Sequence, residues 1–85
     1  MAALKAAFDK AVADCKLLPT KPDNATLLKL YGLYKQSTAG AASGERPGFT
    51  DIVGRAKWDA WGALKGQGAQ ASMQAYIDLV ASLKP

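Results

Sequence analysis

The sequence contains no histidine, which removes the commonest general base and the commonest side-chain ligand for transition metals. A Ser-His-Asp triad and a Cys-His pair are both impossible. With a single cysteine, Cys15, a zinc site would depend almost entirely on carboxylates. The sequence also lacks a pair of carboxylates in an apolar context, so we expect no enzymatic activity, no bound metal and no cofactor.

The single cysteine also rules out an internal disulfide, which is typical of a protein in a reducing compartment. No apolar run approaches the length of about 18 residues that a transmembrane helix needs. Lys5, Asp9 and Lys10 interrupt the N-terminal segment, so it lacks the apolar run of a signal peptide. We therefore expect a cytoplasmic protein in which Cys15 is a small buried hydrophobe.

Acidic residues are scarce, with 7 Asp and Glu against 11 Lys and Arg and a net charge of +4. This excess suits an anionic ligand. The basic residues are dispersed, however, so binding of nucleic acid is not expected. The 85 residues form one domain, 1–85, and a core of this size leaves no room for a large enclosed cavity. A sizeable ligand would lie in a surface groove.

Proline and glycine divide the chain into four segments, with breaks at 19–22, 40–48 and 66–68. Within each segment, apolar residues recur at spacings of three and four, and no segment alternates as a strand would. The pattern predicts an all-α four-helix bundle with helices over about 4–18, 24–39, 54–65 and 69–83. The long linker between the second and third helices permits a parallel crossover.

The second segment carries more apolar surface than a single helical stripe requires. Either its helix is sandwiched between neighbours, or part of its face is left for a ligand. Asp23 or Asn24 is expected to cap the start of this helix, and Gly40 to end it. Gly32, in the middle, should cost about 1 kcal/mol relative to alanine and loosen the helix.

Tyr31 and Lys35 are four residues apart and share a helix face, where a phenol and an ammonium group together could contact a phosphate. Spacing alone nevertheless favours structural roles. A tyrosine on an apolar stripe, such as Tyr76, is more often part of the core. A lysine, such as Lys57, is more often solvated.

The order of several short motifs changes this balance. They are Phe8-Asp9-Lys10-Ala11, Thr20-Lys21-Pro22, Leu30-Tyr31, Tyr34-Lys35-Gln36, Arg46-Pro47-Gly48, Lys57-Trp58-Asp59-Ala60-Trp61 and Ala75-Tyr76-Ile77. Together they closely resemble the acyl-CoA-binding protein family, also called the diazepam-binding inhibitor family, over nearly the whole chain. The Tyr-Lys-Gln and Lys-Trp-Asp-Ala-Trp motifs are highly specific in combination.

This resemblance implies an up-down-down-up arrangement of the helices and a fatty acyl-CoA ligand. Tyr31, Lys35 and Lys57 would contact the ribose 3′-phosphate and neighbouring phosphates. Tyr76 would pack beside the adenine, and Lys16 would lie near the head group. Three apolar residues would line a groove for the acyl chain. The complete set implied to bind the ligand is Lys16, Leu27, Leu28, Tyr31, Lys35, Ala56, Lys57 and Tyr76.

The resemblance also implies a core between the first and fourth helices. At least one of Trp58 and Trp61 would lie against the ligand and the other would be buried, with the order left open. The residues implied to pack the first helix against the fourth are Phe8, Cys15, Leu18, Ile77, Val80 and Leu83.

Some positions depart from the family pattern. Val53 stands where many members have a basic residue, a loss that Arg55 could compensate. Gly68 and Ala71 replace the Ser or Thr cap and the Glu that usually open the fourth helix, which should weaken its first turn.

We therefore expect a monomeric, non-catalytic protein that binds, buffers and transports medium- to long-chain acyl-CoA esters and transiently contacts acyl-CoA-using enzymes or membrane surfaces. One alternative is an interaction protein or a processed signalling precursor, but the sequence has no dibasic cleavage site. Another is an enzyme, because family members occur fused to isomerase domains; this chain has no room for one.

Overall fold

The structure is a computed structural model that describes residues 2–84. Four helices make up most of this range: α1 (Ala2–Cys15), α2 (Asn24–Thr38), α3 (Ile52–Gly62) and α4 (Ala69–Leu83). No strand occurs between residues 2 and 84. The predicted all-α four-helix fold is confirmed.

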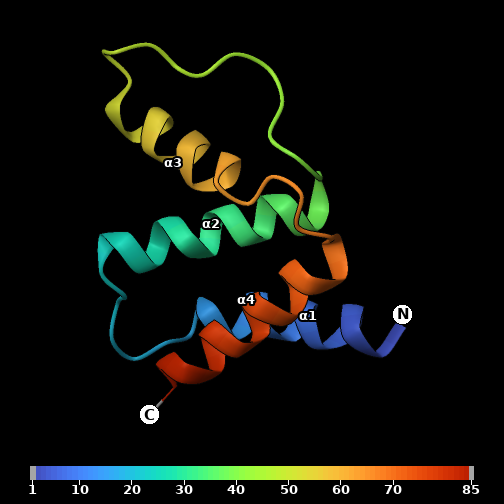
Figure 1. The fold of residues 1–85 in the computed structure, drawn as a ribbon. Coiled ribbons are helices and arrows are strands. Elements are labelled where there is room, and N and C mark those ends of the chain that lie inside the picture. Colours follow the sequence, from blue (N-terminus) through green and yellow to red (C-terminus); the bar gives the residue numbers. More distant parts are fainter. Residues whose placement is uncertain (1, 85) are drawn as a thin grey trace.

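The helices run up, down, down and up (Figure 1). α1 and α4 point in one direction, and α2 and α3 point in the other. The loop between α2 and α3 returns along both helices to start α3 at the same end as α2, as a parallel pair requires. The predicted crossover is therefore present.

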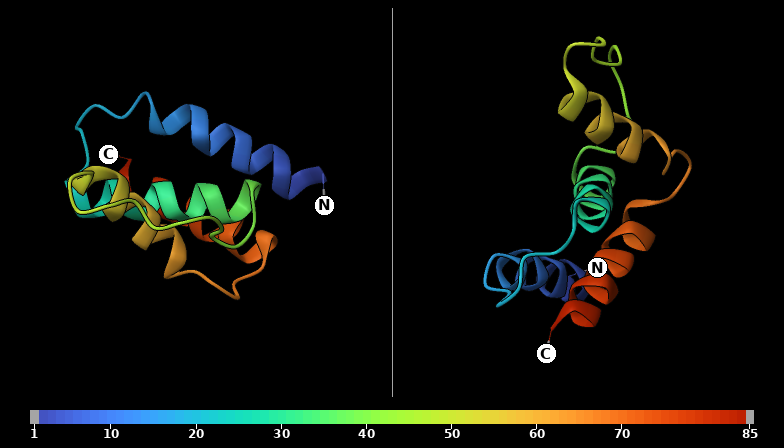
Figure 2. Two further views of the ribbon diagram at one scale, coloured as in Figure 1. Left: turned by 90° about the horizontal axis from the view of Figure 1, so that it is seen from above. Right: turned by 90° about the vertical axis from the view of Figure 1, so that its left-hand side faces the viewer.

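α2 is the central helix, because it packs against α3 on one side and α4 on the other, while α1 packs against α4. Figure 2 shows α3 at one end of the molecule, α1 and α4 at the other, and α2 between them. Among the described helices, α3 packs against α2 alone, and the molecule is flat, with extents of 37 × 30 × 15 Å. The extra apolar residues of α2 therefore pack against both α3 and α4. Part of the surface between α2 and α3 is left uncovered.

The core lies where α1, α2 and α4 meet. Phe8 and Val80 are each 1% exposed, and the ring of Phe8 meets Tyr76 edge to face with 5.2 Å between centroids. Cys15 is half-buried and packs against this core, whereas Leu18 lies outside it. The core residues are Phe8, Ala11, Leu30, Leu33, Tyr76 and Val80, with Ile77 and Leu83 among those packed around them.

The first helix is shorter than predicted, since α1 ends at Cys15 and not near Leu18. Pro19 disfavours helical backbone at the residue before it, so the helix ends before Leu18. The apolar spacing that suggested a longer helix continues past this end. The N–H groups of Lys16 and Leu17 donate to carbonyls three residues earlier, at 3.2 and 2.9 Å. These tighter bonds close the helix in a final turn.

The third helix is shifted towards the N-terminus relative to the predicted 54–65. It starts at Ile52 because the Asp51 carboxylate accepts a hydrogen bond from the Gly54 N–H at 3.0 Å and caps the first turn. It ends at Gly62, and the chain then turns towards Gly66, whose φ is +91°. The apolar Leu64 extends the helical spacing but lies in this turn.

The capping predictions for α2 and α4 are confirmed. The Asp23 carboxylate caps α2 by accepting from the Thr26 N–H at 2.8 Å, and Gly40, with φ of +83°, follows the end of that helix. Gly68 starts α4 without a side-chain cap. The Gln36 amide of α2 donates to the Gln67 carbonyl at 2.7 Å and so holds the turn before α4.

Gly32 has a packing role that helix propensity does not reveal. It is buried in α2, where an added Cβ would come within 2.7 Å of the Ala60 carbonyl oxygen on α3. The propensity cost of Gly32 stays a prediction, and the structure adds a packing role to it. The missing side chain allows the backbones of α2 and α3 to approach closely.

Candidate functional site

A groove of about 350 Å³ lies between α2 and α3, on the open part of their seam. Its walls are contributed by one face of each helix, at helical spacing. The lining residues are Asn24, Leu27, Leu28, Tyr31, Ile52, Val53, Ala56 and Lys57. Five of the eight predicted ligand residues, namely Leu27, Leu28, Tyr31, Ala56 and Lys57, therefore line a single groove.

Asn24 and Ile52 were not predicted to lie in the groove. A signal was available for both. Asn24 lies one turn before Leu28 on α2, and Ile52 lies one turn before Ala56 on α3. Extending each predicted face by four residues would have found them.

The groove is apolar except at Lys57 and the ends of Tyr31 and Asn24. The Lys57 ammonium lies 5.4 Å from the centre of the Tyr31 ring, a cation–π distance that ties α3 to α2. Lys57 is exposed and forms no ion pair with any carboxylate of the described residues. The groove thus combines apolar walls with a positive charge that is free to meet an anion.

Lys35 lies on the same seam but outside the groove. Its ammonium group sits 4.9 Å from the centre of the Trp61 ring. Tyr31 and Lys35 therefore each take part in a cation–π contact with a residue of the Lys-Trp-Asp-Ala-Trp motif. Two ammonium groups, each over an aromatic ring, mark the contact between α2 and α3.

Both tryptophans of this motif hold the long loop. The indole N–H of Trp61 donates to the Gly40 carbonyl at 2.6 Å, and that of Trp58 donates to the Ser43 carbonyl at 3.4 Å. Both side chains are half-buried. Neither tryptophan is fully buried, so this part of the expectation is wrong, and contact of either ring with a ligand stays a prediction.

An ion pair fixes the same loop further along. The Arg46 guanidinium donates to both oxygens of the Asp59 carboxylate, at 2.8 and 2.6 Å. This hydrogen-bonded pair lowers the pKa of Asp59 and raises that of Arg46. The Arg-Pro-Gly and Trp-Asp-Ala motifs are therefore joined in space.

Lys16 and Tyr76 lie away from the groove. Lys16 is exposed in the turn after α1. Tyr76 is 5% exposed and belongs to the core, where burial, followed by the neighbouring Cys15 thiol and Tyr34, raises the pKa of its phenol. The assignment of these two residues to a ligand stays a prediction.

Arg55 does not replace a charge at Val53. Its guanidinium lies 4.6 Å from the centre of the Phe49 ring and is not part of the groove lining. Val53 lines the groove, so the wall is apolar at this position.

Metal-binding clusters and membrane-spanning helices are both absent from residues 2–84. No group of three or more Cys, Asp or Glu side chains within this range could hold a metal ion. None of the helices described in it combines the length and the apolar character that crossing a membrane requires.

Comparisons with known proteins agree on one family. A sequence model described as acyl CoA binding protein matches residues 5–80. Acyl-CoA-binding protein homolog 1 of Caenorhabditis elegans is 46% identical over 76 residues, which are 89% of this chain and 88% of that protein. The crystal structure of Oryza sativa acyl-CoA-binding protein 2 matches with a TM-score of 0.91 and 40% identity, covering 95% of this chain and 88% of that one.

A further relative is much longer than this chain. Human enoyl-CoA delta isomerase 2 is 46% identical over 78 residues, which are 92% of this chain but 20% of the isomerase. The chain therefore spans about a fifth of the length of that protein.

Proposed function

The chain belongs to the acyl-CoA-binding protein family, and from this premise we propose that it binds medium- to long-chain fatty acyl-CoA esters without catalysing a reaction. The observation that carries the proposal is the α2–α3 groove, with apolar walls and the free Lys57 ammonium beside Tyr31. An acyl-CoA has the same two parts, an apolar tail and a polyanionic head.

The tail supplies most of the affinity in this proposal. Leu27, Leu28 and Ala56 offer apolar surface along the groove. Burial of each methylene is worth roughly 0.8 kcal/mol, so a tail of about 14 methylenes has an upper bound of about 11 kcal/mol. Ordering the chain and the loss of translational freedom on binding oppose this gain.

The head supplies the selectivity. Lys57 and Lys35 would form charge-assisted hydrogen bonds to phosphate oxygens, and the Tyr31 hydroxyl would donate a further one. These contacts favour a CoA ester over a free fatty acid, which carries one carboxylate and no phosphate. Lys16 and Tyr76 complete the proposed head-group contacts.

The role that follows is that of a monomeric carrier in the cytoplasm, which buffers acyl-CoA and passes it to enzymes that use it. A similar segment also occurs within the human isomerase. There, a segment similar to this chain makes up a fifth of an enzyme named for a CoA thioester. We propose that this segment of the isomerase binds the CoA ester and does not catalyse the reaction. We propose the same role for this chain.

Calorimetric titration with palmitoyl-CoA tests the proposal, with palmitate and CoA titrated separately as controls. We expect one-to-one binding of the thioester that is at least tenfold tighter than binding of either half. Absence of binding to palmitoyl-CoA, or equal binding of free palmitate, would overturn the proposal. The fold would then serve another partner, as the interaction-protein alternative holds.

A further inference from the structure

Three large apolar side chains are exposed close together at the start of α3. Phe49 is 87% exposed, Ile52 is 76% exposed and Val53 is 63% exposed. They lie within five consecutive residues, at the turn from the long loop into the helix. Single exposed apolar residues are normal, but a contiguous group marks a surface that meets a partner. We call these three residues the rim patch.

The rim patch is continuous with the groove. Ile52 and Val53 line the groove, whereas Phe49 does not and lies beyond its edge. In Figure 1 this segment is the start of α3, where the chain turns out of the long loop at one end of the molecule. Whatever covers the rim patch therefore also faces the mouth of the groove.

Cationic groups border the rim patch. The Arg55 guanidinium lies 4.6 Å from the centre of the Phe49 ring, and Lys57 follows Val53 by one helical turn. Neither forms an ion pair within residues 2–84. The exposed Asp51 carboxylate lies between Phe49 and Ile52 in sequence and caps α3. Arg55 and Lys57 together outweigh this one negative charge, so the border carries a net positive charge.

From these contacts we propose that the rim patch docks on an anionic phospholipid surface, resting on the acyl-CoA binding proposed above. Phe49, Ile52 and Val53 would enter the boundary between head groups and acyl chains. Arg55 and Lys57 would meet lipid phosphates. The groove mouth would then face the bilayer, so that an acyl tail passes from lipid to groove without crossing water.

A lipid surface fits this patch better than a second copy of the chain. Three side chains offer far less area than the roughly 1,200 Å² of total buried surface that a stable pair of proteins requires. The chain carries a net charge of +4, and Arg55 and Lys57 would face their own counterparts across a symmetric contact. The same charges are attracted to anionic lipid.

Vesicle sedimentation with the full chain tests the proposal, comparing phosphatidylcholine vesicles with and without phosphatidylserine. We expect binding that requires phosphatidylserine and weakens as salt rises from about 0.15 to about 1 M, where the screening length falls from about 8 to about 3 Å. Phe49→Ser should weaken it at least tenfold, because the variant removes the aromatic ring that would be buried in the lipid boundary. Arg55→Gln should weaken binding to the phosphatidylserine vesicles and make it less sensitive to salt.

Leu17→Ser is the matched control. Leu17 is 79% exposed and lies beside Lys10 and Lys84 on the other side of the molecule. It should bind vesicles as the unmodified chain does. Equal binding by the Phe49→Ser variant and the unmodified chain, no vesicle binding at all, or loss in Leu17→Ser instead would overturn the proposal. So would a dimer in light scattering that Phe49→Ser dissociates.

The two proposals fail in different measurements. Phe49 lies outside the groove lining, so the Phe49→Ser variant should retain its affinity for palmitoyl-CoA below the concentration at which the ester forms micelles. If vesicle docking fails while the titration shows binding, only the docking proposal is lost. If the titration fails, the carrier proposal is lost whatever the vesicles show.

Discussion

Lys57 contributes a charge whose loss can be measured separately from folding. Its ammonium lies over the Tyr31 ring at the groove and has no carboxylate partner within the described residues. A charge-assisted hydrogen bond contributes about 1.5–3 kcal/mol, so Lys57→Gln should weaken palmitoyl-CoA binding by about 10- to 100-fold. Calorimetric titration measures this change directly.

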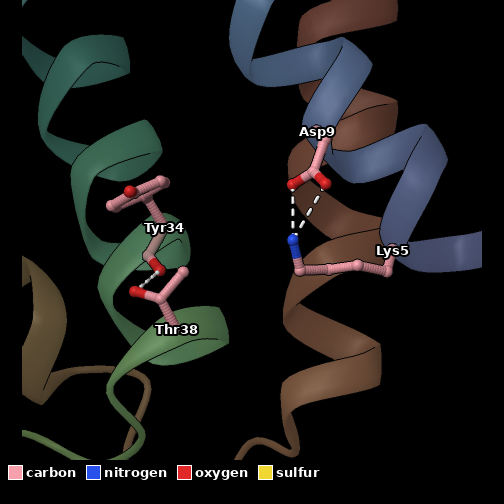
Figure 3. Close-up of polar contacts among 4 residues, drawn as sticks. All are labelled: Lys5, Asp9, Tyr34 and Thr38. Carbon is pink, nitrogen blue, oxygen red and sulfur yellow. Dashed lines mark hydrogen bonds and ion pairs between the residues drawn. The ribbon is translucent and has the colours of Figure 1, made fainter. Parts of the chain in front are cut away.

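The control for this prediction is Lys5→Gln. Lys5 pairs with Asp9 on the exposed face of α1, at 2.7 and 2.9 Å (Figure 3), so the variant removes the same charge far from the groove. Exposed pairs of this kind contribute little. If both variants lose affinity equally, net charge and not the groove lysine governs binding.

Gly32 gives a second prediction at the level of one residue. Alanine is favoured over glycine in a helix by about 1 kcal/mol, so propensity alone predicts that Gly32→Ala stabilises the protein. The Ala60 carbonyl lies 2.7 Å from the position of the added Cβ and belongs to backbone, which cannot rotate away. We expect a net destabilisation of about 1–3 kcal/mol, measured by urea unfolding.

Gly62→Ala is the matched control for Gly32→Ala. Gly62 is also helical, but an added Cβ there would first meet the Trp58 ring at 3.4 Å, an ordinary contact distance. This variant should be neutral or slightly more stable. A stabilised Gly32→Ala variant would show that α2 and α3 can separate at no cost.

At the level of elements, periodicity predicted all four helices but misplaced some of their ends. The first helix was extended to Leu18 because apolar spacing continues into the turn that Pro19 imposes. The third was shifted because the Asp51 cap was not recognised. Spacing reports which residues share a face, whereas capping and proline geometry decide where a helix stops.

The helix order came from the family resemblance, and the long loop only permitted it. What the sequence could not reveal is contact between distant backbones. The role of Gly32 depends on Ala60, and both tryptophan N–H groups meet loop carbonyls. Backbone carbonyls carry no side-chain signature, so such partners become visible only in the folded chain.

The first turn of α4 can be stabilised by substitution. It begins at Gly68 with no side-chain cap, and Ala71 occupies the position of a capping-box acid. The double variant Gly68→Ser, Ala71→Glu should form reciprocal hydrogen bonds with the first-turn N–H groups and raise the free energy of unfolding by about 0.5–1 kcal/mol. Thermal unfolding followed by circular dichroism measures the gain.

Gly48→Ser provides the comparison for α4. Gly48 lies in the loop and a Cβ there has no neighbour within 4 Å, so serine adds no cap and should change stability little. Equal gains in both variants would show that serine acts through the unfolded chain rather than at the helix start.

For the molecule as a whole, five of the eight predicted site residues line one groove and the other three lie elsewhere. The α2 and α3 residues form one groove because the two helices run parallel on a single seam. Lys16 and Tyr76 were assigned by resemblance alone and lie in a turn and in the core. Helical spacing groups residues of one face, but it carries no information about which face of another helix lies opposite.

The whole molecule should lose stability in acid, because three carboxylates accept hydrogen bonds in the folded chain that lower their pKa values. Hydrogen bonds from Lys10 and Lys84 lower the pKa of Asp14, and those from Thr26 and Arg46 lower the pKa of Asp23 and Asp59. The ordinary value is 3.8, so the unfolded chain takes up these protons first. Their stabilisation is complete above about pH 4 and is lost as pH falls through the lowered values.

Asp14 is the residue with which to measure this effect, because it links α1 to the C-terminal end through Lys84 at 2.8 Å. The Asp14→Asn variant should be less stable at pH 7, and its stability should fall less steeply between about pH 4 and pH 2, since one linked proton is removed. The matched control is Asp78→Asn, whose partner is the neutral amide of Gln74. Urea unfolding at several pH values gives both slopes, and an unchanged slope in the Asp14→Asn variant would mean that this junction does not contribute to folding.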